Sequence, residues 1–259
     1  MNKPVFSPSS TLRWSNCPVR YFLEHEQGWK TKFSISGMLI PRLAGQLIAN
    51  KIANYLDSSI ELEENPLEKV NLRTSDLGED MVAEKVLKTV EAGFKVFTEQ
   101  NPYIDMETVW VEKAFPEYGN ARLDALFRNK DSGKLVLPDF KLTSRTPARY
   151  AYHHNMHHYA WVVREILGEL PSRVELCIIN SKELTIIPVS VTEESVEAWL
   201  QTNQQAWERM QNQREGLEKP WMNPSHTDER GNACPFQDAC LRFMWDEQLM
   251  KAGGYEKEV

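Results

Sequence analysis

Apolar residues change their spacing about one hundred residues along the chain. Before that point they recur at helical intervals, in residues 43–56 and again in residues 79–100, as expected for helices with one buried face. Serines at positions 7, 9 and 10 would open a shorter helix ahead of these two. We therefore predict a helical N-terminal region, residues 1–105, that packs on the rest of the chain.

The middle of the chain predicts a mixed β-sheet. Residues 108–115, 121–128 and 134–142 are short runs rich in Val, Leu and Phe, separated by turn-like segments, and they predict a three-stranded meander. A helix at 147–167 then leads to two further strands, at 173–180 and 184–190, and a crossover helix of this kind joins parallel strands. With a last helix at 192–217, the expected fold class is α/β, a mixed central sheet flanked by helices.

Length and composition suit one folded structure. The 259 residues are 41% hydrophobic and 26% charged, so we expect the helical region at 1–105, a core at 106–217 and a cysteine-bearing tail at 218–259 to form one unit. No run approaches the ~18 consecutive apolar residues of a membrane span, and the opening segment lacks the apolar core of a secretory signal. The expectation is a cytoplasmic protein without membrane association.

The net charge of -7 argues against a general nucleic-acid coat protein, because such a protein needs a basic surface. Residues 128–149 are nevertheless a basic island in an acidic chain. This island could line one positive cleft, or it could be an ordinary solvated stretch. Arg145 and Arg149, which lie in the island, are candidates for contacts to a nucleic-acid backbone.

Two aspartates in the predicted meander are the main chemical candidates. If the turn occupies residues 130–133, Asn129 pairs with Lys134 and Asp124 faces Asp139 on the neighbouring strand. Carboxylates directly opposite each other lie about 5 Å apart at Cβ and repel unless a cation lies between them. Mg²⁺ takes one or two protein carboxylates and completes its shell with water and phosphate oxygens. The pair therefore predicts a divalent-metal site.

Lys141 follows Asp139 by two residues, so on a strand it projects from the same face. Its ammonium could hold or deprotonate an attacking water, or offset charge that builds on a phosphorane. Glu112 would lie beside Asp124 on the adjacent strand, as a proton acceptor or as a support for the ligands. A solvated hairpin is the alternative, but the apolar neighbours of Asp139 favour a buried strand, where unpaired charges are costly.

The motifs together resemble the PD-(D/E)XK nucleases of the RecB-like branch, which includes recombination nuclease domains, CRISPR-adaptation nucleases and phage exonucleases. They run over most of the chain, as a serine-rich start with Cys17-Pro18, then Gly45, Glu112, the strand of Asp124, Pro138-Asp139-Phe140-Lys141 and Asn155-x-x-x-Tyr159. The resemblance implies a restriction-endonuclease-like core, Asp124 and Asp139 as metal ligands and Lys141 as the catalytic lysine. Asn155 and Tyr159 would contact the substrate from one face of a helix.

The resemblance also implies a DNA nuclease that depends on Mg²⁺ or Mn²⁺. End-processing relatives favour an exonuclease acting in recombination, repair or phage DNA metabolism, with DNA as its partner and a recombination or CRISPR-type protein partner left open. Ala49 stands where the family usually has a metal-binding histidine. A non-catalytic DNA-binding or accessory protein that keeps the nuclease fold is therefore the alternative.

Two further clusters could bind metal. By resemblance Cys17, Cys234 and Cys240 would hold an iron-sulfur cluster, although Gly231 takes the place of a fourth cysteine; the alternative is that they are core thiols. The second cluster is the histidine-rich segment at residues 153–158, whose members are spaced as i, i+4 pairs. We expect these histidines to contact phosphate near the cleft or to lie in solvent, with a separate metal site as the third hypothesis. Cys177 reads as a core residue.

Overall fold

The computed structural model describes residues 14–15, 17–31, 36–59, 79–143, 154–217, 248, 251 and 255–257. The chain divides into two compact units, one formed by Ile35–Val196 and the other by Met1–Ser34 with Glu197–Val259. The three-segment division expected from the sequence stays a prediction. Within the described residues, no helix is both long and apolar enough to cross a membrane.

The unit Ile35–Val196 contains a five-stranded mixed sheet in the order β2-β3-β4-β5-β6. Strands β2, β3 and β4 form an antiparallel meander, β5 lies parallel to β4, and β6 is antiparallel to β5. The predicted α/β fold class and the crossover between the two parallel strands are confirmed. The strands are β2 (Glu107–Phe115), β3 (Ala121–Arg128), β4 (Leu135–Leu142), β5 (Arg173–Ile179) and β6 (Leu184–Val189).

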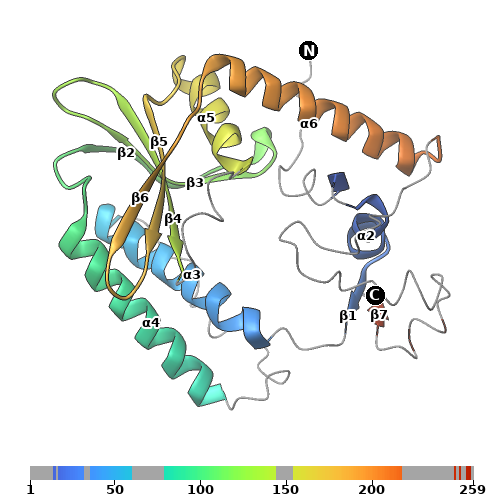
Figure 1. Ribbon diagram of the computed structural model, residues 1–259, viewed down its shortest axis with the longest axis horizontal. Coiled ribbons are helices and arrows are strands. Elements are labelled where there is room, and N and C mark those ends of the chain that lie inside the picture. The colour runs from blue at the N-terminus through green and yellow to red at the C-terminus, as the bar shows by residue number, and fades with distance from the viewer. Residues whose placement is uncertain are drawn as a thin grey trace. The chain divides into compact units, whose positions relative to one another are not determined.

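Helices α3 (Ser36–Leu56) and α4 (Glu79–Gln100) cover one face of this sheet (Figure 1). Their apolar faces meet Phe127, Phe140 and Ile179 in the main hydrophobic core. Gly93 lets α4 pack closely on the sheet, because a Cβ there would come within 2.6 Å of Leu142 Cδ1. Burial of this core is what orders β4, the strand that carries the candidate chemistry.

Helix α5 (His154–Leu167) connects β4 to β5 and contacts β3. Its buried residues Met156, Ala160 and Val163 repeat at helical spacing. A helix was predicted from residue 147, and residues 147–153 lie outside the described residues. Asn155 and Tyr159 lie outside this buried stripe, one helical turn apart on α5.

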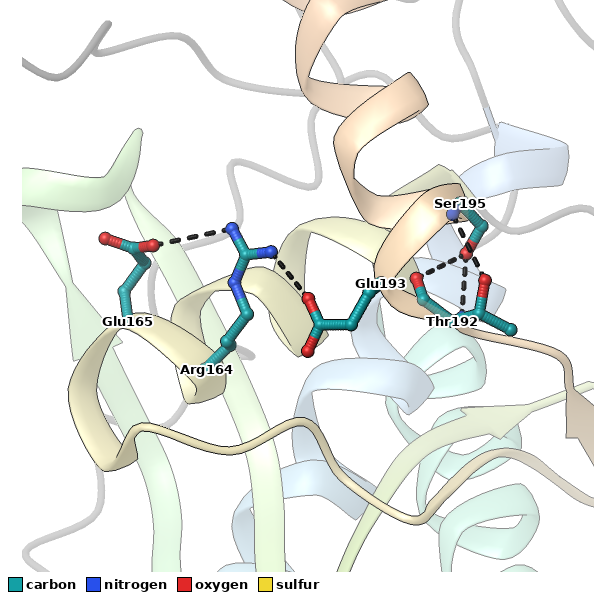
Figure 2. Close-up of polar contacts among 5 residues, drawn as sticks. All are labelled: Arg164, Glu165, Thr192, Glu193 and Ser195. Carbon is teal, nitrogen blue, oxygen red and sulfur yellow. Dashed lines mark hydrogen bonds and ion pairs between the residues drawn. The ribbon is translucent and has the colours of Figure 1, made fainter.

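Helix α6 (Glu193–Arg214) begins next to α5 (Figure 2). Thr192 and Ser195 cap its first turn, since each backbone amide bonds to the other residue's hydroxyl oxygen, at 2.9 and 3.2 Å. Arg164 of α5 donates to Glu193 at 2.8 Å and lies 3.5 Å from Glu165. These contacts fix the end of α5 against the start of α6.

The other unit contains α2 (Pro18–Tyr21), the π-helical segment η1 (Phe22–Glu26), β1 (Trp29–Thr31) and β7 (Tyr255–Lys257). Strands β1 and β7 pair antiparallel, so a short stretch of the C-terminal tail joins the N-terminal segment. A small core of Trp14, Tyr21, Ala206 and Met210 lies within this unit.

Candidate functional site

Strands β3 and β4 meet in the predicted register. Phe127 pairs with Val136, and the amide of Asn129 donates to the carbonyl of Lys134 at 2.9 Å across the turn. A count along both strands from these pairs brings residue 124 opposite residue 139. The hairpin geometry on which the metal-site prediction depends is thus confirmed at its turn.

The pairing between β3 and β4 ends at Phe127 and Val136. Hydrogen-bonded pairs alternate along an antiparallel ladder, so the next one would require Pro138 to donate to Ala125. Proline has no N–H to donate, and no further residue pairs of these two strands are formed. Instead the amide of Phe140 donates to Oδ2 of Asp124 at 2.7 Å. The side chain of Asp124 therefore occupies the gap where a backbone partner would otherwise lie.

Asp124, Asp139 and Lys141 come together at this gap. Lys141 Nζ lies 2.6 Å from Asp139 Oδ2 and 4.0 Å from Asp124 Oδ2. Asp139 is 1% exposed, and its Oδ2 is buried without a hydrogen bond of good geometry. A buried carboxylate oxygen that relies on one ion pair still has coordination capacity, which is what a metal ligand requires.

The charges at the gap influence one another strongly. Burial raises the pKa of Asp124 to about 6; Lys141 opposes this shift, Asp139 adds to it, and the Phe140 amide opposes it. Burial alone would lower the pKa of Lys141, but the charges of Asp139 and Asp124 outweigh burial and raise it. Lys141 is therefore a cation in this arrangement.

Glu112 lies opposite Asp124 in the register of β2 and β3, between the pairs of residues 111 with 125 and 113 with 123. Its backbone is left-handed, with φ 46°, which is uncommon for any residue except glycine. Its carboxylate accepts a hydrogen bond from Arg122 Nε at 2.6 Å. Glu112 thus contacts Arg122, whose positive charge opposes a small part of the rise in the pKa of Asp124.

Helix α5 brings Tyr159 to the same group. Burial raises the pKa of Tyr159, and the charge of Asp139 adds to that shift, while Lys141 and a hydrogen bond with Asn155 oppose it. Tyr159 consequently lies close to both charged strand residues as a neutral phenol. The predicted pair Asn155 and Tyr159 is brought together with the strand residues.

The prediction for the histidine-rich segment is wrong for His158. This residue is 1% exposed, and its Nε2 lies 2.7 Å from the carbonyl of Tyr118, so Nε2–H is the donor. Burial lowers the pKa of His158 to about 4, against a smaller raising effect of the Tyr118 bond. His158 is buried from solvent, and its hydrogen bond ties the β2–β3 connection to α5. Trp161 and Val162 were the available signal, because these apolar residues lie three and four positions after His158 and so share its side of the helix.

Several predicted residues lie outside the described residues. These are Arg145, Arg149, Cys234, Cys240 and His153. Cys17 is described: it is buried, and its sulfur accepts a hydrogen bond from the amide of Arg20 at 3.5 Å at the start of α2. Cys177 is a buried free thiol, as predicted.

A divalent metal fits the oxygen donors at the gap. The described residues contain no group of three or more His, Cys, Asp and Glu side chains placed to hold a metal. Asp124 and Asp139 supply two carboxylates at this point, both near Lys141 Nζ, and Mg²⁺ accepts such a set because it keeps waters and phosphate oxygens. Ala49, at the position predicted for a histidine, lies within α3 and contributes no ligand.

Two contacts at the site escaped prediction. The bond from the Phe140 amide to Asp124 had no sequence signal except Pro138 in a central strand, a position that proline usually avoids. Arg122 could have been found, since it precedes Asp124 by two residues and so shares its face of the strand.

The chain was also compared with known proteins. A family model described as the PD-(D/E)XK nuclease superfamily matches residues 5–241. Nineteen chains of solved structures match; one, described as a putative exonuclease from Eubacterium rectale, is 15% identical, with 85% of each chain covered and a TM-score of 0.44. No curated protein matches. Because the family model spans most of its length, the chain belongs to the PD-(D/E)XK nuclease superfamily.

Proposed function

We propose that this protein is a DNA nuclease that depends on Mg²⁺ or Mn²⁺ and removes nucleotides from DNA ends. The observation that supports the proposal is the convergence of Asp124, Asp139 and Lys141 where β3 and β4 separate. A RecB-like role in recombination, repair or phage DNA metabolism belongs to the same proposal and rests on the order of the motifs in the sequence.

Each residue of the site has a distinct role in this reaction. Asp124 and Asp139 would hold the cation, and the Phe140 amide fixes the orientation of Asp124. A divalent cation bound there would supply Lewis-acid polarisation of the scissile phosphate and would help to activate water for attack. Lys141, as a cation, donates hydrogen bonds to the attacking water or to a phosphate oxygen and offsets the charge of the transition state.

Asn155 and Tyr159 are placed to contact the DNA strand or to brace Lys141. They share one face of α5, one helical turn apart, and Tyr159 lies within electrostatic reach of Asp139 and Lys141. A neutral phenol there can donate a hydrogen bond to a phosphate oxygen without adding repulsion.

The second candidate is a DNA-binding protein that has kept the nuclease fold and lost its chemistry. Ala49 favours this candidate, because α3 provides no imidazole at the position where the family usually has one. The two candidates differ in a single observable, which is cleavage in the presence of metal.

The test uses linear and covalently closed duplex DNA, labelled at either end, with Mg²⁺, Mn²⁺ or EDTA. We expect the wild type to shorten linear DNA from its ends with metal and to leave closed DNA intact. Asp139→Asn should reduce the rate by at least about 100-fold, since even residues that support metal ligands are worth 10- to 100-fold. Asp131→Asn, which changes an exposed turn aspartate, is the matched control and should cut like the wild type. DNA binding without cleavage under every metal condition would contradict the proposal in favour of the second candidate.

A further inference from the structure

Arg122 lies near Asp124, and it has no role in the reaction proposed for Asp124, Asp139 and Lys141. It occupies β3 two residues before Asp124, so the two side chains share one face of the sheet. Exposure increases outward from the buried ligand: the side chain of Asp139 is 2% exposed, that of Lys141 is 32% and that of Arg122 is 44%. The guanidinium thus lies at the rim of the site.

Glu112 holds this guanidinium from the neighbouring strand. The contact is direct, 2.6 Å from Arg122 Nε to Glu112 Oε2, and the Glu112 side chain is only 11% exposed. An arginine bound through Nε has a defined plane, and its terminal NH₂ groups are aimed by the anchoring carboxylate. Glu112 adopts its left-handed backbone at this position, and strained residues of this kind are concentrated at functional sites.

The acidic side chains at the site outnumber the basic ones, so Arg122 matters for the binding of a phosphate there. Glu112, Asp124 and Asp139 carry three negative charges when ionised, and Lys141 and Arg122 carry two positive charges. Lys141 lies 2.6 Å from Asp139, and in the proposed reaction it serves the scissile phosphate and its attacking water. A nucleic-acid strand that crosses the site presents phosphates on both sides of the scissile bond, and a phosphate next to two aspartates is repelled unless a cation faces it.

We infer that Arg122 binds a phosphate of the nucleic acid next to the scissile one, and that Glu112 is the positioning residue that holds Arg122 for this contact. The inference rests on the proposed function, because it assumes a nucleic-acid strand over Asp124 and Asp139. Arginine suits the role, since its planar fork matches the oxygens of a phosphate.

The fold contains a matched control for this pair. Arg173 on β5 donates through Nε to Glu175 at 2.7 Å, with an exposed guanidinium and a buried carboxylate, as in the Arg122 pair. Glu175 precedes Leu176, the partner of Asp139 in the parallel pairing, so Glu175 points to the opposite face of the sheet. Loss of Arg173 should therefore disturb folding in a similar way without affecting the nucleic-acid contact.

The experiment measures binding of a labelled linear DNA duplex with Ca²⁺ in place of Mg²⁺, at several salt concentrations. Arg122→Gln should weaken binding about tenfold and reduce the dependence of log Kd on log salt by about one unit, the value of one lost phosphate contact. Arg122→Lys should keep the salt dependence, because it keeps the charge. Glu112→Gln should weaken binding less than Arg122→Gln and leave the salt dependence unchanged. Arg173→Gln should bind like the wild type.

Unchanged binding and salt dependence in Arg122→Gln would overturn the inference, and so would an equal loss in Arg173→Gln. Thermal unfolding of each variant shows whether it is folded. If the wild type binds this DNA but cuts nothing with Mg²⁺ or Mn²⁺, nuclease activity is contradicted while the comparison of variants still decides the role of Arg122. A wild type that binds no DNA would overturn both.

Discussion

The carboxylate of Asp124 accepts a hydrogen bond from the backbone amide of Phe140 at 2.7 Å, across the gap between β3 and β4. A side chain thus replaces the backbone partner that the strand lost at Pro138. The same bond orients a predicted metal ligand and satisfies an amide of the sheet. Burial makes the charge of Asp124 unfavourable for folding, whereas the proposed metal needs that charge. Removal of the charge should therefore affect stability and activity in opposite directions.

Replacement of Asp124 by asparagine should stabilise the metal-free protein and abolish cleavage. The amide oxygen can still accept from Phe140, but the charge next to Asp139 is removed. Because the pKa of Asp124 is raised from 3.8 to about 6, the gain at neutral pH should reach up to about 3 kcal/mol. Urea unfolding in EDTA measures it.

The gain from Asp124→Asn should depend on pH with a defined sign. Below pH 3.8 the wild-type carboxyl is protonated in both folded and unfolded chains, so the two proteins differ least. Between pH 3.8 and about 6 the unfolded wild type releases this proton while the folded wild type keeps it, so the stability of the wild type falls as pH rises. The difference in stability between the variant and the wild type therefore widens over this range and is constant above it. A variant that is less stable than the wild type at pH 8 would contradict this interpretation, and Asp131→Asn is the control.

Lys141→Met should lower the rate of DNA cleavage by about 10²- to 10⁴-fold while the protein stays folded. Because Lys141 is a cation in the site, Lys141→Arg should retain more activity than Lys141→Met. Initial rates on end-labelled linear DNA at constant Mg²⁺ measure both. A Met variant that cuts at the wild-type rate would remove Lys141 from the mechanism.

His158 should make the folded state less stable in mild acid. Its pKa is lowered to about 4 by burial, against 6.5 in the unfolded chain, so the unfolded state alone takes up a proton between these values. Stability should therefore fall as pH decreases from 6.5 to 4, by up to about 3 kcal/mol. His158→Gln, which can still donate to the Tyr118 carbonyl, should show a smaller fall over the same range. Equal pH slopes in the two proteins would contradict the assignment.

Tyr103→Phe should destabilise the fold without changing the chemistry. The Tyr103 hydroxyl donates to Glu175 at 2.7 Å and lies 3.0 Å from Cys177 Sγ, in the core on the face opposite Asp139. Its loss removes a donor from a buried carboxylate, which costs about 1–3 kcal/mol. Unfolding measures the loss, with Tyr55→Phe at an exposed position as control. An unchanged unfolding midpoint would contradict the role given to this hydroxyl.

The helices and strands could be predicted from sequence periodicity, because the burial of apolar side chains determines where they form. Helix α4 begins and ends at the predicted residues, and β3 does too, since each has a regular apolar face. The hairpin register followed from the turn at residues 130–133, because a turn of known length leaves a single pairing for the strands beyond it.

Contacts that depend on local departures from regular structure were not predictable. The ladder ends before Pro138, and Glu112 has a positive φ within β2, so the partners of Asp124 differ from those of an ideal sheet. The pairing of β1 with β7 joins residues near the two ends of the sequence, and no local pattern encodes such a contact. Asp124, Asp139 and Lys141 were identifiable because regular strands alone bring them to one face.

The metal site is tested most directly by X-ray diffraction from crystals soaked in Mn²⁺, with the anomalous signal recorded for the wild type and for Asp139→Asn. We expect an anomalous peak in the wild type within coordination distance of both Asp124 and Asp139, about 2.0–2.2 Å for a small divalent cation bound by oxygen. The peak should be absent from Asp139→Asn. A wild type with no peak at these carboxylates, or with its peak at other residues, would contradict the claim that Asp124 and Asp139 hold the catalytic metal.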